Sequence, residues 1–81
     1  MKDLKTLLNL QENHFNFENC NEKGGKEFYI DYKNNYIGTL NLNNHTFVTY
    51  YKLKRNKIMK EMIEKKLILI LKKSKIKIVN R

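Results

Sequence analysis

Residues 27–51 read EFYIDYKNNYIGTLNLNNHTFVTYY, and this stretch decides the fold. It contains three runs rich in tyrosine, isoleucine, threonine, phenylalanine and valine, the residue types that favour β-strands. Two asparagines separate each run from the next, and asparagine tolerates the positive φ of a tight two-residue turn. The stretch predicts a three-stranded antiparallel meander with strands at Glu27–Lys33, Tyr36–Leu42 and His45–Tyr51.

Two-residue turns at Asn34-Asn35 and Asn43-Asn44 would fix the register of the meander, so both faces of the sheet can be assigned. The first face has no charged side chain and is the predicted core. It holds Phe28, Ile30, Tyr32, Ile37, Val48 and Tyr50, with Thr39, Asn41 and Thr46. The second face mixes aromatic with charged residues. It holds Tyr29, Tyr36, Leu40, Leu42, Phe47 and Tyr51, with Glu27, Asp31, Lys33 and His45.

Two shorter patterns precede the meander. Leu4, Leu7 and Leu8 have the i, i+3, i+4 spacing of one helix face, which predicts a short helix over Met1–Leu10. Phenylalanine alternates with polar residues over His14–Cys20, which predicts an edge strand. A helix and a strand therefore lead into the meander.

The segment after the meander predicts a longer helix over Lys54–Lys66. Its apolar stripe consists of Ile58, Met59, Met62 and Ile63. Lys66 falls at the centre of that stripe, so we expect the helix to end there. Strands over 67–71 and 76–79, joined by a turn at 72–75, would then form a C-terminal β-hairpin. The predicted fold class is α+β.

Length and charge limit the class of protein. The chain has 81 residues, which predicts one small basic domain over residues 1–81. Its net charge of +9 is uneven: residues 1–50 hold five lysines and six acidic residues, whereas residues 51–81 hold twelve basic and two acidic residues. Such a basic segment favours a polyanionic partner, of which nucleic acid is the commonest.

Codon usage offers a second explanation for the lysines. Lysine, asparagine, isoleucine, tyrosine and phenylalanine make up more than half of the chain, and alanine and proline are absent. This composition indicates an AT-rich genome, which by itself enriches lysine over arginine. A solvated surface that keeps a small protein soluble would contain the same lysines.

The basic candidates fall into two groups. Lys52, Lys54, Arg55 and Lys57 stand at the predicted start of the last helix, where exposed backbone N–H groups already favour phosphate. The second group lies in the tail and consists of Lys72, Lys73, Lys75, Lys77 and Arg81. For this group the alternative role is protection of an edge strand against aggregation.

Four aromatic residues of the second face are candidates for stacking on nucleic-acid bases. They are Tyr29, Tyr36, Phe47 and Tyr51. The alternative is that the N-terminal helix or the C-terminal hairpin covers this face and makes it a second core. A chain of this size has little surface to bury, which favours the covered arrangement.

Catalysis, metals and membranes receive little support. Cys20 is the single cysteine, so neither an internal disulfide nor a zinc cage is expected, and no cofactor motif is present. His14 and His45 are the histidines, with no nucleophile motif beside them. We expect no catalytic residue and no membrane partner. The chain shows no signal peptide, so we expect a cytoplasmic protein.

The order helix, three strands, helix resembles the double-stranded RNA-binding domain. In that family a lysine cluster at the start of the last helix contacts phosphates, and Lys52, Lys54, Arg55 and Lys57 stand in a comparable place. The glycine-lysine signature of the family is missing before this helix. The resemblance covers topology alone, and we assign no family on it.

The sequence thus supports two hypotheses. The first is a non-enzymatic protein that binds RNA or a ribonucleoprotein through phosphate contacts from its C-terminal third. The second is an inhibitor encoded by a phage or mobile element, similar to anti-CRISPR proteins. It would dock on a nucleic-acid-guided defence nuclease and block guide or target binding.

Overall fold

A computed structural model describes residues 2–50 and 57–79, and it confirms the α+β class. The elements are α1 (Lys2–Glu12), β1 (Phe15–Asn19), β2 (Glu27–Tyr32), β3 (Asn35–Asn41), β4 (Thr46–Thr49), α2 (Lys57–Lys73) and β5 (Lys77–Val79). The strands form one five-stranded sheet in the order β1-β2-β3-β4-β5. The pairs β1–β2, β2–β3 and β3–β4 are antiparallel, whereas β5 runs parallel to β4.

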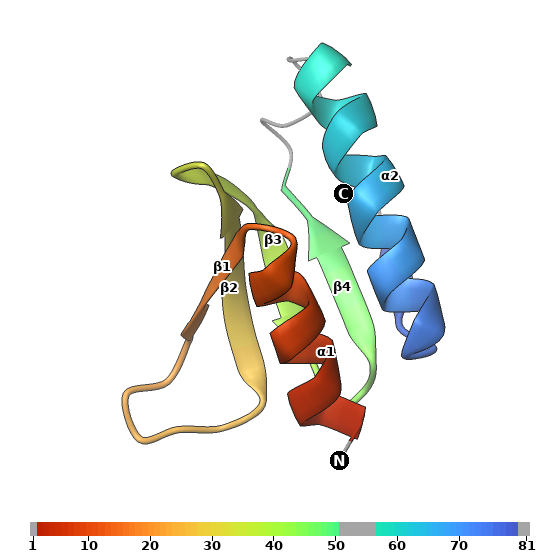
Figure 1. Ribbon diagram of the computed structural model, residues 1–81. Coiled ribbons are helices and arrows are strands. Elements are labelled where there is room, and N and C mark those ends of the chain that lie inside the picture. Colours follow the sequence, from red (N-terminus) through yellow and green to blue (C-terminus); the bar gives the residue numbers. More distant parts are fainter. Residues whose placement is uncertain (1, 51–56, 80–81) are drawn as a thin grey trace.

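Both helices lie on the same face of the sheet (Figure 1). The core fills the space between helices and sheet. It consists of Leu10, Phe15, Ile30, Tyr32, Ile37, Leu40, Leu42, Phe47, Ile63, Leu67, Ile70, Leu71 and Ile76. The opposite side of the sheet, here called the open sheet face, is covered by neither helix. Within the described residues, neither helix is long and apolar enough to cross a bilayer.

The predicted faces are correct as far as Ile37 and wrong beyond it. The first turn is Lys33-Asn34, with φ of 48° and 67°, rather than Asn34-Asn35. Asp31 then pairs with Tyr36, but Ile30 pairs with Gly38, so one extra residue bulges from β3. Because strand side chains alternate, one extra residue exchanges the two faces for the rest of the meander.

The bulge brings three apolar residues of the predicted second face into the core: Leu40, Leu42 and Phe47. It also moves five residues of the predicted core face to the open sheet face: Thr39, Asn41, Thr46, Val48 and Tyr50. The register of β3 with β4 is as predicted, with Thr39 opposite Val48. The error therefore comes from the bulge alone.

Gly38 explains why the chain bulges here. A Cβ built at this glycine would lie 2.3 Å from the Val48 carbonyl oxygen and 2.6 Å from Cζ of Phe47. The Phe47 ring therefore packs directly on the backbone of β3, and only glycine leaves room for it. The ring is fully buried, so this close packing lies in the centre of the core.

The predicted C-terminal hairpin is wrong, because α2 continues through Leu67–Leu71 to Lys73. Lys66 does fall on the buried side, but its Nζ lies 3.4 Å from the Tyr32 hydroxyl and 5.5 Å from the centre of that ring. The long lysine side chain thus keeps its charge at a polar partner while its stem is half-buried. Residues 77–79 form a strand as predicted, but it pairs with β4 instead of with residues 67–71.

Gly38→Ala should lower the free energy of unfolding by about 2 kcal/mol, because overpacking a core costs about 1–3 kcal/mol. Urea denaturation followed by circular dichroism measures this. Asn34→Gly is the control: Asn34 has a φ of 67°, where glycine fits without strain, so its stability should be unchanged or slightly raised. Equal stability of Gly38→Ala and the wild type would contradict the packing argument.

Candidate nucleic-acid interface

The end of α2 places four of the predicted lysines close together. The Ile76 N–H donates to the Leu71 carbonyl at 2.9 Å, and the Lys75 N–H donates to the Lys72 carbonyl at 3.1 Å. These two bonds form a Schellman motif, in which Ile76 and Leu71 also bury their side chains. The motif reverses the chain tightly, so Lys72, Lys73, Lys75 and Lys77 all lie at one end of the molecule.

Lys75 occupies the position of the Schellman motif that is usually glycine. Its φ is 57°, in the left-handed region, where a side chain with a Cβ costs about 1–2 kcal/mol. The folded protein is therefore less stable with lysine at this position than it would be with glycine. Its side chain is exposed, so it makes no compensating apolar contact in the core.

The N-terminal helix adds a fifth cation that the sequence analysis missed. The hydroxyl of Thr6, which is buried, is hydrogen-bonded to the hydroxyl of Ser74. This bond joins α1 to the turn after α2. Lys5 is exposed and immediately precedes Thr6, so it belongs to the same end. We call Lys5, Lys72, Lys73, Lys75 and Lys77 the lysine-rich end.

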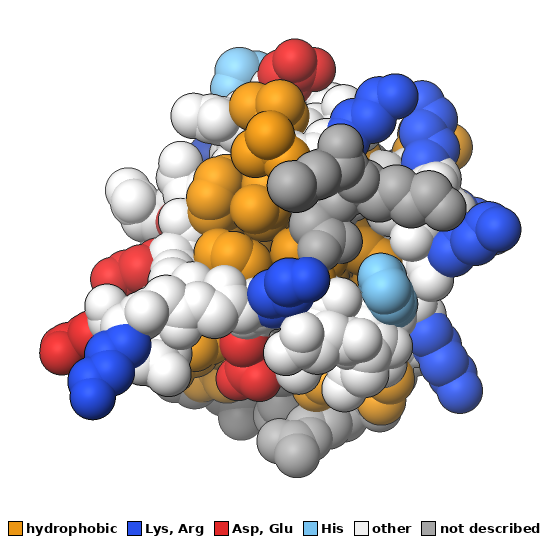
Figure 2. All heavy atoms as spheres, turned by 90° about the horizontal axis from the view of Figure 1, so that it is seen from below, with side chains coloured by type: hydrophobic (Ala, Val, Ile, Leu, Met, Phe, Trp, Pro, Cys, Tyr) orange, Lys and Arg blue, Asp and Glu red, His pale blue; other side chains and the backbone are white. Residues whose placement is uncertain are grey.

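The lysine-rich end has an excess of positive charge. Residues 71–79 contain no acidic residue, and within the described part of the chain none of these five lysines pairs with a carboxylate. Figure 2 views the molecule from below, and most lysine side chains lie on its right, whereas acidic side chains lie on the left, at the top and just below the centre. The summed charge attracts anions to this side.

One other predicted cation that the structure describes, Lys57, is not part of this cluster. Lys57 is exposed at the first residue of α2, and a helix of this length places it about 24 Å from Lys73. Lys52, Lys54, Arg55 and Arg81 lie outside the described residues, as does Tyr51. Among the described residues of the predicted basic set, Lys57 therefore lies apart, and Lys72, Lys73, Lys75 and Lys77 are brought together.

The predicted stacking residues that the structure describes lie on two different faces of the sheet. Phe47 is wrong as a stacking residue, because it is 1% exposed and belongs to the core. Tyr29 and Tyr36 lie on the open sheet face, 47% and 37% exposed. For these two tyrosines the alternative of a second core is wrong, because both helices pack on the other face.

Tyr50 is a third aromatic residue on the open sheet face, and the sequence analysis assigned it to the core. The Tyr36 ring lies between the other two, with centroid distances of 5.9 Å to Tyr29 and 4.7 Å to Tyr50. The Tyr36 hydroxyl is hydrogen-bonded to the Thr39 hydroxyl, which restrains the ring. These three residues form the tyrosine cluster.

Charges on the open sheet face are separated by strand. Glu18, Glu27 and Asp31 extend from β1 and β2, and Asn41 donates a hydrogen bond to Glu27 at 3.2 Å. Lys77 of β5 pairs with Thr46 of β4 and lies on the same face. The face is therefore acidic along β1 and β2 and basic at β5, with the tyrosine cluster between.

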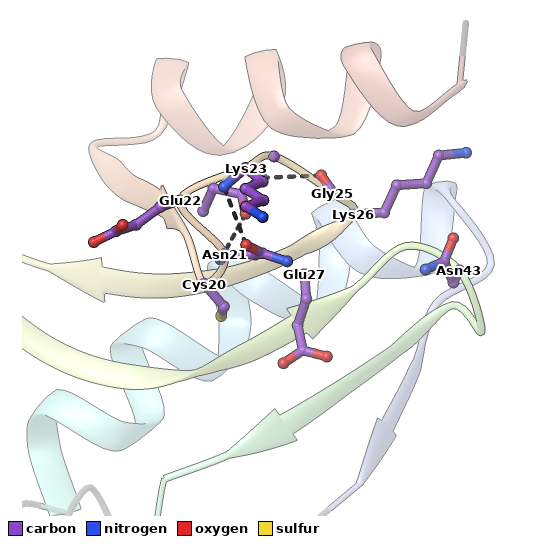
Figure 3. Close-up of a pocket in the computed structure, with 10 residues that line it drawn as sticks. Cys20, Asn21, Glu22, Lys23, Gly25, Lys26, Glu27 and Asn43 are labelled. Atoms are coloured by element: carbon purple, nitrogen blue, oxygen red, sulfur yellow. Dashed lines mark hydrogen bonds between the residues drawn. The ribbon is translucent and has the colours of Figure 1, made fainter.

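The loop between β1 and β2 borders an open hollow of about 740 Å³ (Figure 3). Asn19 shapes the loop by accepting from the Asn21 N–H and donating to the Gly25 carbonyl. Partial burial, reinforced by Glu27, raises the pKa of the Cys20 thiol above its usual value. Cys20 is therefore mainly a neutral thiol near pH 7, which is a poor nucleophile.

Lys75→Gly should raise the free energy of unfolding by about 1 kcal/mol, because glycine adopts the left-handed conformation without steric cost. Lys72→Gly removes the same charge from the same end but places glycine inside α2, so it should lower stability by about 1 kcal/mol. Thermal unfolding compares the two variants directly. A loss of stability in both would contradict the proposed C-terminal cap.

Comparison with known proteins gives no match, whether to protein-family models, to curated sequences or to solved structures. The described residues also contain no group of histidine, cysteine or acidic residues that could hold a metal ion. The functional argument therefore depends on the lysine-rich end and the open sheet face themselves.

Proposed function

We propose that this protein binds RNA without catalysing a reaction, through phosphate contacts from the lysine-rich end. The observation that carries the proposal is the convergence of five exposed lysines from α1, α2, the following turn and β5. Lysines that neutralise phosphates release condensed counterions, which supplies most of the affinity of sequence-independent binding. A ribonucleoprotein would offer the same phosphates.

Stabilisation of α2 explains only part of this cluster. Lys72 and Lys73 stand in the last turn of the helix, where cations interact favourably with its dipole. Lys75 and Lys77 lie beyond the helix, and Lys75 occupies a strained backbone position. The helix dipole therefore accounts for Lys72 and Lys73 and leaves Lys75 and Lys77 for a role in binding.

Lys73→Glu with Lys77→Glu should weaken RNA binding by about ten-fold or more. If four lysines each neutralise one phosphate of a single strand, log K against log salt should have a slope of about −3. Loss of two contacts should reduce that slope by about 1.4. Fluorescence anisotropy with a labelled RNA, titrated at several salt concentrations, measures both quantities.

The matched control is Lys23→Glu with Lys33→Glu, which makes the same change in net charge. Lys23 lies in the β1–β2 loop and Lys33 in the β2–β3 turn, and both are exposed. The control should keep the wild-type salt slope. Equal losses in the two double variants would mean that binding is a net-charge effect, and absence of binding at low salt would refute the proposal.

A second candidate function is inhibition of a nucleic-acid-guided nuclease by docking on it. The observation that favours a protein partner is a set of exposed apolar side chains on the outer side of α2, here called the outer stripe, formed by Ile58, Met62 and Leu69 and interrupted by the exposed Lys65. Ile58 is 83% exposed and Leu69 is 66% exposed, so these large side chains bury little of their surface within the described chain.

Ile58→Glu with Met62→Glu separates this candidate from the first. The pair should abolish inhibition of cleavage by a purified guide-loaded nuclease, because charge in the stripe prevents an apolar contact. RNA binding should change little, because the lysine-rich end is intact. Retained inhibition in this variant would remove the stripe as the docking surface.

A further inference from the structure

We infer that the open sheet face binds the bases of a single RNA strand by stacking them on the tyrosine cluster. This inference rests on the proposed function and specifies its substrate class as single-stranded rather than duplex RNA. It assigns the cluster a separate role from the lysine-rich end. The lysines hold phosphates, and the tyrosines hold unpaired bases.

The tyrosine cluster has the exposure that stacking requires. Tyr29 and Tyr36 are each more than one-third exposed although they lie on central strands of the sheet. Their rings meet edge to face at 77°, and Tyr36 is tilted by 56° to Tyr50. Rings that support one another in this way keep fixed orientations, so little side-chain freedom remains to be lost when a base stacks.

The charges of the open sheet face select the direction of the strand. Glu18, Glu27 and Asp31 repel phosphates from β1 and β2, whereas Lys77 attracts them to β5. The favoured course has the bases over the tyrosine cluster and the phosphates on its β4 side, from Tyr36 on β3 across β4 to Lys77. The register places the two ends of this course about 20 Å apart, a span for a few nucleotides.

This course joins the two surfaces. Lys77 belongs to the lysine-rich end and also extends from the open sheet face, because it pairs with the outward-facing Thr46. A strand leaving the tyrosine cluster therefore ends at a lysine that is two residues from Lys75. The exposed rings and the cation at the end of this course thus favour one occupant, a single strand whose phosphates lie over β4 and β5.

A duplex fits this surface poorly. Bases inside an A-form helix are stacked on one another and present only their edges, so they offer no ring face to tyrosine. A single strand can turn its bases outward, and base–aromatic stacking tolerates any sequence. Binding should therefore depend on strandedness and only weakly on sequence.

The test compares a labelled twelve-nucleotide oligouridine with the same strand annealed to oligoadenosine, by fluorescence anisotropy. The wild type should bind the single strand at least about ten-fold more tightly than the duplex. Tyr36→Leu should lose about ten-fold for the single strand and little for the duplex, and Tyr36→Phe should retain binding because it keeps the ring. Tyr29→Leu is a second variant if Tyr36→Leu unfolds.

Leu8→Ala is the matched control, because it removes an exposed apolar side chain from α1, away from the open sheet face. It should change neither affinity. Intrinsic fluorescence gives an independent measurement, because the chain has five tyrosines and no tryptophan. The single strand should quench tyrosine emission, and the duplex should not.

The outcomes separate this inference from the proposed function. If Tyr36→Leu and Tyr29→Leu bind the single strand as the wild type does, while Lys73→Glu with Lys77→Glu loses binding, the stacking inference is wrong and the phosphate site stands. Equal affinity of the wild type for single strand and duplex would also overturn it. If no RNA binds at low salt, both are wrong.

Discussion

The contact between the Phe47 ring and Gly38 determines which side chains of the sheet face the helices. Phe47 lies on β4 and Gly38 on the neighbouring strand β3. The Phe47 ring occupies the space that any Cβ on Gly38 would fill. The ring can enter the core only if β3 turns its glycine inward at that point. The bulge at Ile37 makes this possible, and every residue from Gly38 to Tyr50 takes its face accordingly.

Local residue preferences were sufficient to predict the elements up to the start of α2, but not the C-terminal part of the fold. The β-branched and aromatic runs gave the meander, and the leucine spacing gave α1. The faces were not predictable from turn length, because a bulge depends on packing between strands rather than on the turn. The length of α2 was not predictable either, because Lys66 is accommodated by the Tyr32 hydroxyl, which is far away in the sequence.

The candidate site was predictable as a set of residue types but not as a surface. Charge counting identified Lys72, Lys73, Lys75 and Lys77, and the turn after α2 groups them. Lys5 joined them only through the bond between Thr6 and Ser74, which are 68 positions apart. No local pattern in the sequence reports such a contact, so the contribution of α1 could be found only from the structure.

The bulge that closes the core also assembles the tyrosine cluster. In a regular ladder Ile37 and Tyr50, which are hydrogen-bonded through their backbones, would share a face. The extra residue allows Ile37 to turn inward while Tyr50 stays outside beside Tyr36. Core packing and the exposed aromatic surface therefore have one structural cause. Substitutions on the open sheet face can alter the tyrosine cluster alone, whereas any change that removes the bulge must alter the core and the cluster together.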